Sequence, residues 1–255
     1  MTAADLSDVE RDHSSMQTFS TFFKKEIFAE VAMPAKPSQK VVIVCGGIPS
    51  SPSKRTILEF FAKKGYWAIA IRYRGSWESK GVFLKQSPHQ DVLDVLDELP
   101  KGFTDLWTKK KFKLHPKKIF VVGTSFGGAA ALLASRDPRV DGVIALAPVV
   151  DWSQRSKDEP LPRFVRFMKE AYGEAYRTKL WHKLGKNNFY EPTGNEDGSK
   201  IVIIHAQDDK TVDIKEVKTF ARKTKSNFIL LKRGGHLSTS VIMRPALWKK
   251  VKRML

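Results

Sequence analysis

The sequence contains almost no cysteine and no long apolar run. With one cysteine in 255 residues, no disulfide can form within the chain, which fits a reducing compartment. No stretch approaches the roughly 18 apolar residues that a membrane-spanning helix requires. Residues 1–13 are polar and acidic, without the basic start and apolar core of a secretory signal. We therefore expect a cytoplasmic protein with no membrane span.

Acidic residues are also few relative to basic ones. The chain has 27 Asp and Glu against 45 Lys and Arg, for a net charge of +18. Lysines concentrate at 109–118 and again at 249–253. Such charge can attract nucleic acid, other anions or an acidic membrane surface. Because no nucleic-acid-binding motif accompanies it, a solvated basic surface is the favoured interpretation, and we expect no nucleic-acid partner.

Apolar runs of strand length alternate with helical patterns along most of the chain. This alternation indicates a mostly parallel α/β sheet with helices on both faces, in a single domain over residues 1–255. Residues 22–33 predict an early antiparallel strand or hairpin arm, after a loose or helical lead-in over 1–20. The other expected strands are 40–45, 66–72, 119–122, 140–147, 200–205 and 227–231; the expected helices are 56–64, 88–99, 213–223, one starting at 125 and one within 238–255.

The alternation breaks once, at about 151–195. This segment has helical spacing and many aromatic residues, and it predicts a short helical cap over the carboxyl edge of the sheet, where open α/β sheets bind ligands. Trp152 and Trp181 are candidates for shaping the substrate pocket. Ordinary packing of the cap onto the core is an equally weighted alternative.

The most informative segment is Gly-Thr-Ser-Phe-Gly at 123–127. It follows an apolar strand and opens an alanine-rich helix, the context of a nucleophile elbow. Gly123 and Gly127 remove Cβ atoms that would clash in so tight a turn. The Ser125 hydroxyl would then lie at a helix N-terminus, where negative charge is favoured. The sequence therefore predicts Ser125 as a nucleophile; a glycine-rich turn with an idle serine is the alternative.

A serine nucleophile requires a general base and a carboxylate that orients it. His236 lies in the glycine-rich loop after the last strand, which suits the base better than the positions of the other histidines. The loop after strand 200–205 offers Asp208 and Asp209. Spacing favours Asp209 as the acid, with Asp208 as the alternative.

An oxyanion hole requires two backbone N–H groups near the reacting carbonyl oxygen. The residue after the nucleophile, Phe126, supplies one candidate. The loop Cys-Gly-Gly-Ile-Pro-Ser (45–50) supplies the other, and Ile48 is the favoured donor. A plain turn is the alternative for this loop. Cys45 ends an apolar run and is expected to be a buried core residue.

The order Ser125, Asp209, His236, with the motifs around them, resembles the α/β-hydrolase family from about residue 22 onward. Residues 72–83 and 147–152 are similar to the acylaminoacyl peptidase and prolyl oligopeptidase branch, although Trp77 replaces the usual glycine. The chain is too short to hold the β-propeller of those peptidases and looks like a stand-alone esterase.

The resemblance implies an α/β-hydrolase fold and hydrolysis of a small-molecule carboxylic ester through a Ser-His-Asp acyl-enzyme. No metal or organic cofactor is expected, because no His/Cys cluster has ligand spacing. Two other hypotheses are an amide hydrolase acting on short peptides and a non-catalytic binding protein on the same fold.

Overall fold

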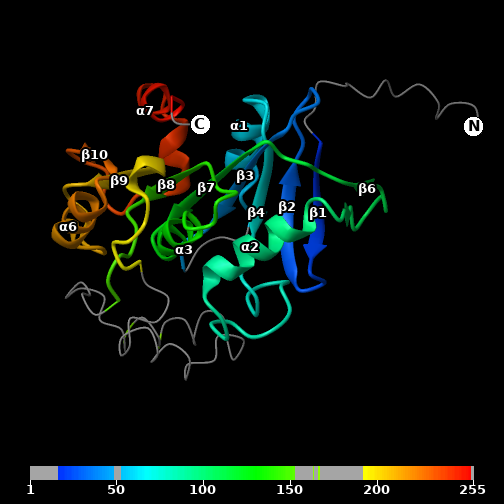
Figure 1. Cartoon of the computed structure of the whole chain (residues 1–255), viewed down its shortest axis with the longest axis horizontal. Coiled ribbons are helices and arrows are strands. Elements are labelled where there is room, and N and C mark those ends of the chain that lie inside the picture. The colour runs from blue at the N-terminus through cyan, green and yellow to red at the C-terminus, as the bar shows by residue number, and fades with distance from the viewer. Residues whose placement is uncertain (1–16, 49–52, 153–162, 164–165, 167–191, 254–255) are drawn as a thin grey trace, which may run out of the picture.

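A computed structural model describes residues 17–48, 53–152, 163, 166 and 192–253. Its centre is an eight-stranded sheet in the order β1-β2-β4-β3-β7-β8-β9-β10 (Figure 1). The strands from β4 to β10 in this order run parallel, and β1 and β2 join antiparallel. The strands are β1 Thr18–Phe23, β2 Ile27–Ala32, β3 Lys40–Cys45, β4 Trp67–Ile71, β7 Lys118–Thr124, β8 Gly142–Leu146, β9 Ile201–Ala206 and β10 Asn227–Leu231.

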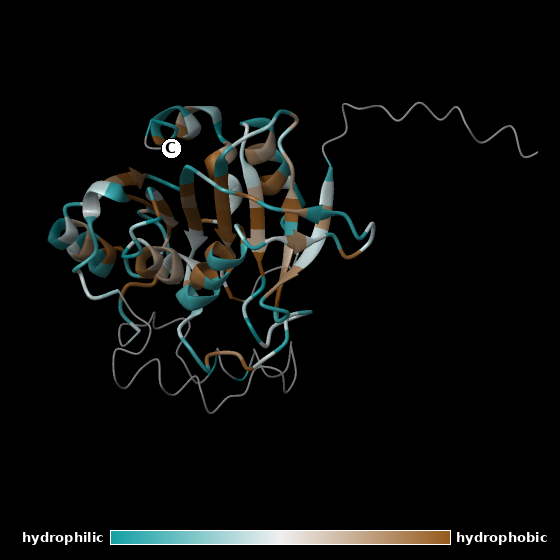
Figure 2. Cartoon of the chain, turned by 45° about the vertical axis from the view of Figure 1, so that its right-hand side comes forward, coloured by the Kyte–Doolittle hydropathy of each residue, from teal (hydrophilic) through white to brown (hydrophobic). Residues whose placement is uncertain are grey.

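Helices cover both faces of this sheet, because alternate strand residues point to opposite sides. In β3, Val41 and Ile43 belong to one apolar core, and Val42 and Val44 belong to the other. The first core is closed by α2 (Pro88–Glu98), α3 (Phe126–Ala134) and α6 (Ile214–Thr224). The second is closed by α1 (Arg55–Lys63), the 3-10 turn η3 (Thr239–Met243) and α7 (Pro245–Val251). The brown centre of the sheet in Figure 2 shows this apolar filling.

The parallel α/β architecture predicted from the alternation is confirmed, with a difference near the start of the chain. The strand β1 already begins at Thr18, inside the expected lead-in, and a tight turn with positive φ at Lys24 and Lys25 separates it from β2. The closing helix expected within 238–255 is α7, which begins at Pro245 because proline fits the first turn of a helix. The η3 turn precedes it.

Two short elements escaped sequence reasoning because they carry too few residues to show a period. They are the hairpin of β5 (Phe103–Thr104) with β6 (Lys111–Phe112) and the 3-10 turn η2 (Gly198–Lys200). Most of the predicted cap, about 151–195, lies outside the described residues. Among the residues that the structure describes, no helix combines the length and apolar character needed to cross a bilayer.

Folding half-buries His89 at the start of α2, which makes stability pH-dependent. Burial, assisted by the positive charge of Arg136, lowers the pKa of His89 from 6.5 to about 4. Between these values the unfolded chain binds a proton that the native chain does not, so stability is lost as the pH falls from about 6.5. We expect His89 to remove about 2–3 kcal/mol of unfolding free energy between pH 7 and pH 4.

Urea unfolding at pH 7, 5.5 and 4.5 measures this loss. His89→Gln should reduce the fall of the unfolding free energy between pH 7 and pH 4.5. His115→Gln, at an exposed histidine, should leave this pH dependence unchanged. An equal pH dependence in wild type and His89→Gln would contradict the assignment.

Candidate active site

Ser125 occupies a strained turn between β7 and α3. Its φ of 54° and ψ of −118° are rare for a residue with a side chain, and such strain is typical of functional sites. A Cβ on Gly123 would lie 2.0 Å from the carbonyl oxygen of Gly127, and one on Gly127 would lie 2.3 Å from that of Cys45. Only glycine fits at both positions, so the sharp strand-to-helix turn expected from the sequence is present.

The loop after β3 lies against this turn. A Cβ on Gly47 would come within 3.2 Å of the Ser125 Cβ, so the loop backbone passes beside the serine. Ile48 follows in the same loop and is half-buried against the core. Phe126 begins α3 and is buried. The structure therefore brings the two segments that carry Ile48 and Phe126 together at Ser125.

Asp209 and His236, the acid and the base predicted from the sequence, meet across two loops. The Asp209 carboxylate accepts a hydrogen bond of 2.9 Å from Nδ1 of His236, and further bonds from the N–H groups of Thr211 (2.8 Å) and Val212 (3.1 Å). Burial by itself raises the pKa of Asp209, but the hydrogen bond and charge of His236 and these N–H groups outweigh it and hold the pKa below its ordinary value. The carboxylate is therefore ionised at neutral pH.

Asp208 contacts the histidine loop in a different way. Its carboxylate accepts the backbone N–H of Gly235 at 2.9 Å, and the hydrogen bond of the His236 ring goes to Asp209 instead. Of the two acids that the sequence left open, Asp209 is the one hydrogen-bonded to His236.

A further hydrogen bond joins the serine turn to the histidine loop. The hydroxyl of Thr124, the residue before Ser125, donates to the carbonyl oxygen of Leu237, the residue after His236, at 2.7 Å. Within the described residues, no hydrogen bond links Ser125 directly to His236. The imidazole is half-exposed, with 29% of its side chain accessible. The serine and histidine segments are thus tied together by a hydrogen bond between the residues next to Ser125 and His236.

His205, near the end of β9, contacts the loop that carries Asp209. Its Nε2 lies 3.2 Å from the carbonyl oxygen of Val212 and 3.6 Å from the Asp209 carboxylate, and the side chain is fully buried. Burial lowers the pKa of His205 and outweighs the attraction of Asp209, so the ring is neutral at neutral pH. A neutral Nε2–H donates to the Val212 carbonyl and keeps the acid loop in place.

Sequence reasoning missed Tyr73, which follows β4. Its hydroxyl donates to the carbonyl oxygen of Gly46 at 3.0 Å, in the loop that leads to Ile48. Its ring packs edge-on against Phe126, with ring centroids 5.2 Å apart. Burial raises the pKa of the Tyr73 hydroxyl, so it stays protonated and donates. The Arg-Tyr-Arg-Gly motif at 72–75 was the signal that could have identified it.

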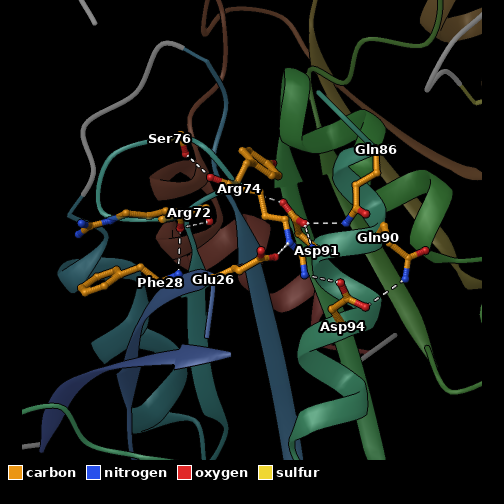
Figure 3. A network of polar contacts seen from close by, with 11 residues as sticks. Glu26, Phe28, Arg72, Arg74, Ser76, Gln86, Gln90, Asp91 and Asp94 are labelled. Atoms are coloured by element: carbon orange, nitrogen blue, oxygen red, sulfur yellow. Dashed lines mark hydrogen bonds and ion pairs between the residues drawn. The ribbon is translucent and has the colours of Figure 1, made fainter. Parts of the chain in front are cut away.

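A charge network surrounds Arg74, the residue that follows Tyr73 (Figure 3). The backbone N–H of Arg74 donates to Asp91 at 2.9 Å. The Arg74 guanidinium pairs with Asp91, with Glu26 at 2.6 Å and with Asp94 at 2.7 Å. The carbonyl oxygen of Tyr73 accepts hydrogen bonds from the N–H and the hydroxyl of Ser76. These contacts fix Tyr73 against the Gly46 loop.

The remaining candidate residues have mixed outcomes. Trp152 is buried, and its ring lies 5.6 Å from that of Phe126, so it packs beside the candidate site. Trp181 lies outside the described residues. Cys45 is fully buried, as predicted, and burial raises the pKa of its thiol. Among the described residues, no group of three or more His, Cys, Asp or Glu side chains is arranged to hold a metal ion.

The sheet order, the serine turn and the Asp–His pair define an α/β-hydrolase. The chain belongs to the family described as serine aminopeptidase, S33 (Hydrolase_4), whose model matches residues 35–197. This membership confirms the predicted fold class and family resemblance and makes the protein a hydrolase. No curated protein matches the sequence.

Solved structures with the same fold are similar over nearly all of the chain. An esterase of Pyrococcus furiosus, Pf2001, is 18% identical with a TM-score of 0.65, over 94% of this chain and 92% of that one. A 2-hydroxy-6-oxo-6-phenylhexa-2,4-dienoate hydrolase of Rhodococcus sp. is 16% identical with a TM-score of 0.63, over 93% and 100%. An acylaminoacyl peptidase of Pyrococcus horikoshii is 18% identical with a TM-score of 0.56, over 94% of this chain and 40% of that one.

Proposed function

We propose that the protein hydrolyses carboxylic esters of small molecules through a Ser125-His236-Asp209 acyl-enzyme mechanism. The observation that carries the proposal is the hydrogen bond from His236 Nδ1 to the buried Asp209 carboxylate, 2.9 Å long, beside the strained Ser125 turn. Because Nδ1–H donates to Asp209, Nε2 of the neutral imidazole is left without a proton. That nitrogen can accept the proton of a serine hydroxyl.

In the proposed reaction, Ser125 Oγ attacks the ester carbonyl carbon as His236 Nε2 takes its proton. The carbonyl oxygen becomes an oxyanion, stabilised by the N–H groups of Phe126 and Ile48, each worth roughly 3–4 kcal/mol in comparable sites. His236 then protonates the leaving alcohol, and the acyl group remains on Ser125. Water, deprotonated by His236 Nε2, attacks the carbonyl carbon of the acyl-enzyme. The bond to Ser125 Oγ then breaks, His236 returns the proton to Oγ, and the carboxylic acid is released.

A second candidate is hydrolysis of amides in short peptides by the same residues. The family description, serine aminopeptidase, favours it. Trp152 and Trp181 are proposed to contact the substrate in either case, because Trp152 packs beside Phe126 and Trp181 belongs to the aromatic segment predicted to cap the site. The acyl and alcohol groups of the substrate are to be found by assay.

The test compares p-nitrophenyl esters from acetate to decanoate with aminoacyl p-nitroanilides, using the whole chain. Faster turnover of the esters supports the esterase proposal, and their chain-length optimum measures the acyl pocket. Faster turnover of the anilides favours the peptidase. Absence of turnover, together with no labelling by a fluorophosphonate, would overturn both in favour of a binding protein.

Tyr73 provides a test of the proposed oxyanion loop. Tyr73→Phe keeps the ring against Phe126 but leaves the Gly46 carbonyl without its donor. We expect kcat for the preferred ester to fall about 10- to 100-fold with KM unchanged. A poorly positioned N–H donor stabilises the transition state less, while the binding of the substrate changes little. Affinity for a trifluoromethyl ketone, which forms the tetrahedral adduct, should fall in parallel.

Tyr66→Phe is the matched control, since Tyr66 is a buried tyrosine in the core on the other face of the sheet. Thermal unfolding of both variants monitors folding. If the two variants lose kcat equally, Tyr73 has no special role at the oxyanion loop.

A further inference from the structure

The β5–β6 hairpin carries Lys109, Lys110 and Lys111, the first part of the lysine cluster at 109–118, which the proposed reaction does not use. The hairpin pairs Phe103 with Phe112 and packs against the outer strand β1. The Phe19 and Phe112 rings stack with their centroids 4.6 Å apart. In Figure 1 the hairpin projects from the sheet beyond β1. An apolar base therefore holds it while its tip points outward.

The tip is an ordered turn built around Asp105. Its carboxylate is buried and accepts hydrogen bonds from the Trp107 N–H, at 2.9 Å, and from the Thr108 hydroxyl. The backbone closes with Asp105 N–H to Lys110 at 2.9 Å and Lys109 N–H to Asp105 at 3.0 Å. The direction of the Trp107 backbone is therefore set by internal hydrogen bonds.

This ordered turn presents an indole directly to solvent. Trp107 is 91% exposed, the most exposed of the large apolar side chains in the described structure, and its neighbour Leu106 is 37% exposed. An isolated exposed leucine is ordinary, but a tryptophan that is exposed to solvent on an ordered turn indicates a contact surface. The cluster continues with exposed lysines at 109, 110, 111 and 113.

We propose that this tip binds an anionic lipid surface, with Trp107 inserted at the headgroup level and Lys109, Lys110 and Lys111 against lipid phosphates. Tryptophan favours the boundary between water and lipid because one edge of the ring is apolar and its N–H is polar. Lysines next to an anionic leaflet add attraction that depends on salt. The protein would lie on the surface without crossing it.

The shape and chemistry of the tip favour lipid over other partners. A convex tip with one indole and one leucine needs a deformable partner, because a protein would have to supply a matching pocket to bury them. All the basic residues at the tip are lysines, whereas recognition of nucleic acid bases favours the two-pronged guanidinium of arginine. An anionic bilayer can accommodate both the inserted indole, at the headgroup level, and the point charges of the lysines, beside the lipid phosphates.

This surface lies away from the candidate active site. The hairpin precedes the amino end of β7, whereas Ser125 follows its carboxyl end. Lipid binding can therefore be altered without touching the residues of the proposed reaction, and its test does not depend on hydrolysis.

The experiment is co-sedimentation of the whole chain with vesicles of phosphatidylcholine, alone or with 30% phosphatidylglycerol. We expect binding to the anionic vesicles alone, weakening as salt rises. Lys109→Gln/Lys110→Gln/Lys111→Gln should reduce the partition coefficient about 100-fold, at roughly 1 kcal/mol per lysine. Trp107→Ala should reduce it about tenfold by removing inserted apolar area. Brominated lipids should quench part of the indole fluorescence of the wild type. This quenching should be absent in Trp107→Phe, which lacks the inserted indole.

Two variants elsewhere serve as matched controls. Lys249→Gln/Lys250→Gln/Lys252→Gln removes the same charge from the second cluster, and Trp77→Ala removes another exposed indole. Both should bind as the wild type does. The proposal is overturned if the wild type does not sediment with anionic vesicles, if the two lysine triples lose binding equally, or if Trp107→Ala binds normally. Equal binding to an RNA homopolymer that is lost in Trp107→Ala would also overturn it, in favour of nucleic acid.

Discussion

Ser125→Ala is expected to lower kcat for the preferred p-nitrophenyl ester by about 10⁴-fold or more, because it removes the atom that forms the acyl-enzyme. Labelling by a fluorophosphonate should disappear at the same time. Stability should change little, since within the described residues no hydrogen bond links the Ser125 side chain to another group. The measurement is steady-state hydrolysis of wild type and variant side by side, with urea unfolding of each.

Ser135→Ala, at the other end of α3, is the control for this prediction. Ser135 is buried and its hydroxyl donates to Leu132, so the variant tests whether any serine change in this helix impairs the enzyme. It should retain hydrolysis within about twofold. Activity within tenfold of wild type in Ser125→Ala would place the nucleophile elsewhere.

Asp209→Asn is expected to lower kcat about 10³- to 10⁴-fold while the fold persists. An asparagine amide can donate to His236 Nδ1, which places the proton on Nε2. A protonated Nε2 in the neutral ring cannot accept the proton of Ser125. The ionised Asp209 carboxylate also stabilises the imidazolium formed during the reaction, and asparagine removes this charge.

Asp208→Asn distinguishes this role from the loss of a loop contact. Asparagine keeps an oxygen that can accept the Gly235 N–H, so kcat should fall less than tenfold. The two variants change the same charge at neighbouring positions, and both are measured with the preferred ester over pH 5–9. A larger loss in Asp208→Asn than in Asp209→Asn would reverse the assignment of the acid.

Much of the architecture could be predicted from local patterns. Buried parallel strands appear in the sequence as continuous apolar runs, which predict β3, β4, β7, β8 and β9. The apolar run at 227–231 likewise predicts β10, although β10 lies at the edge of the sheet and is only partly buried. The turn at Ser125 was predictable because Gly123 and Gly127 stand on either side of a serine between a strand and a helix, where residues with a Cβ would clash. The short β5–β6 hairpin was not, because each of its strands has too few residues to show a period.

By itself, the sequence determined the parallel α/β class, the strained serine turn and the loops that would carry a base and an acid, because glycine spacing and apolar periodicity act over a few residues. Only the tertiary structure shows that Asp209 is hydrogen-bonded to the His236 ring, whereas Asp208 accepts the Gly235 N–H. Both acids follow β9, and they differ in which group they meet in a loop 27 residues further along the chain. The tertiary structure also decided that Tyr73 supports the Gly46 loop and that Trp107 faces solvent. Contacts between distant segments and exposure depend on how the whole chain packs, and no local pattern encodes them.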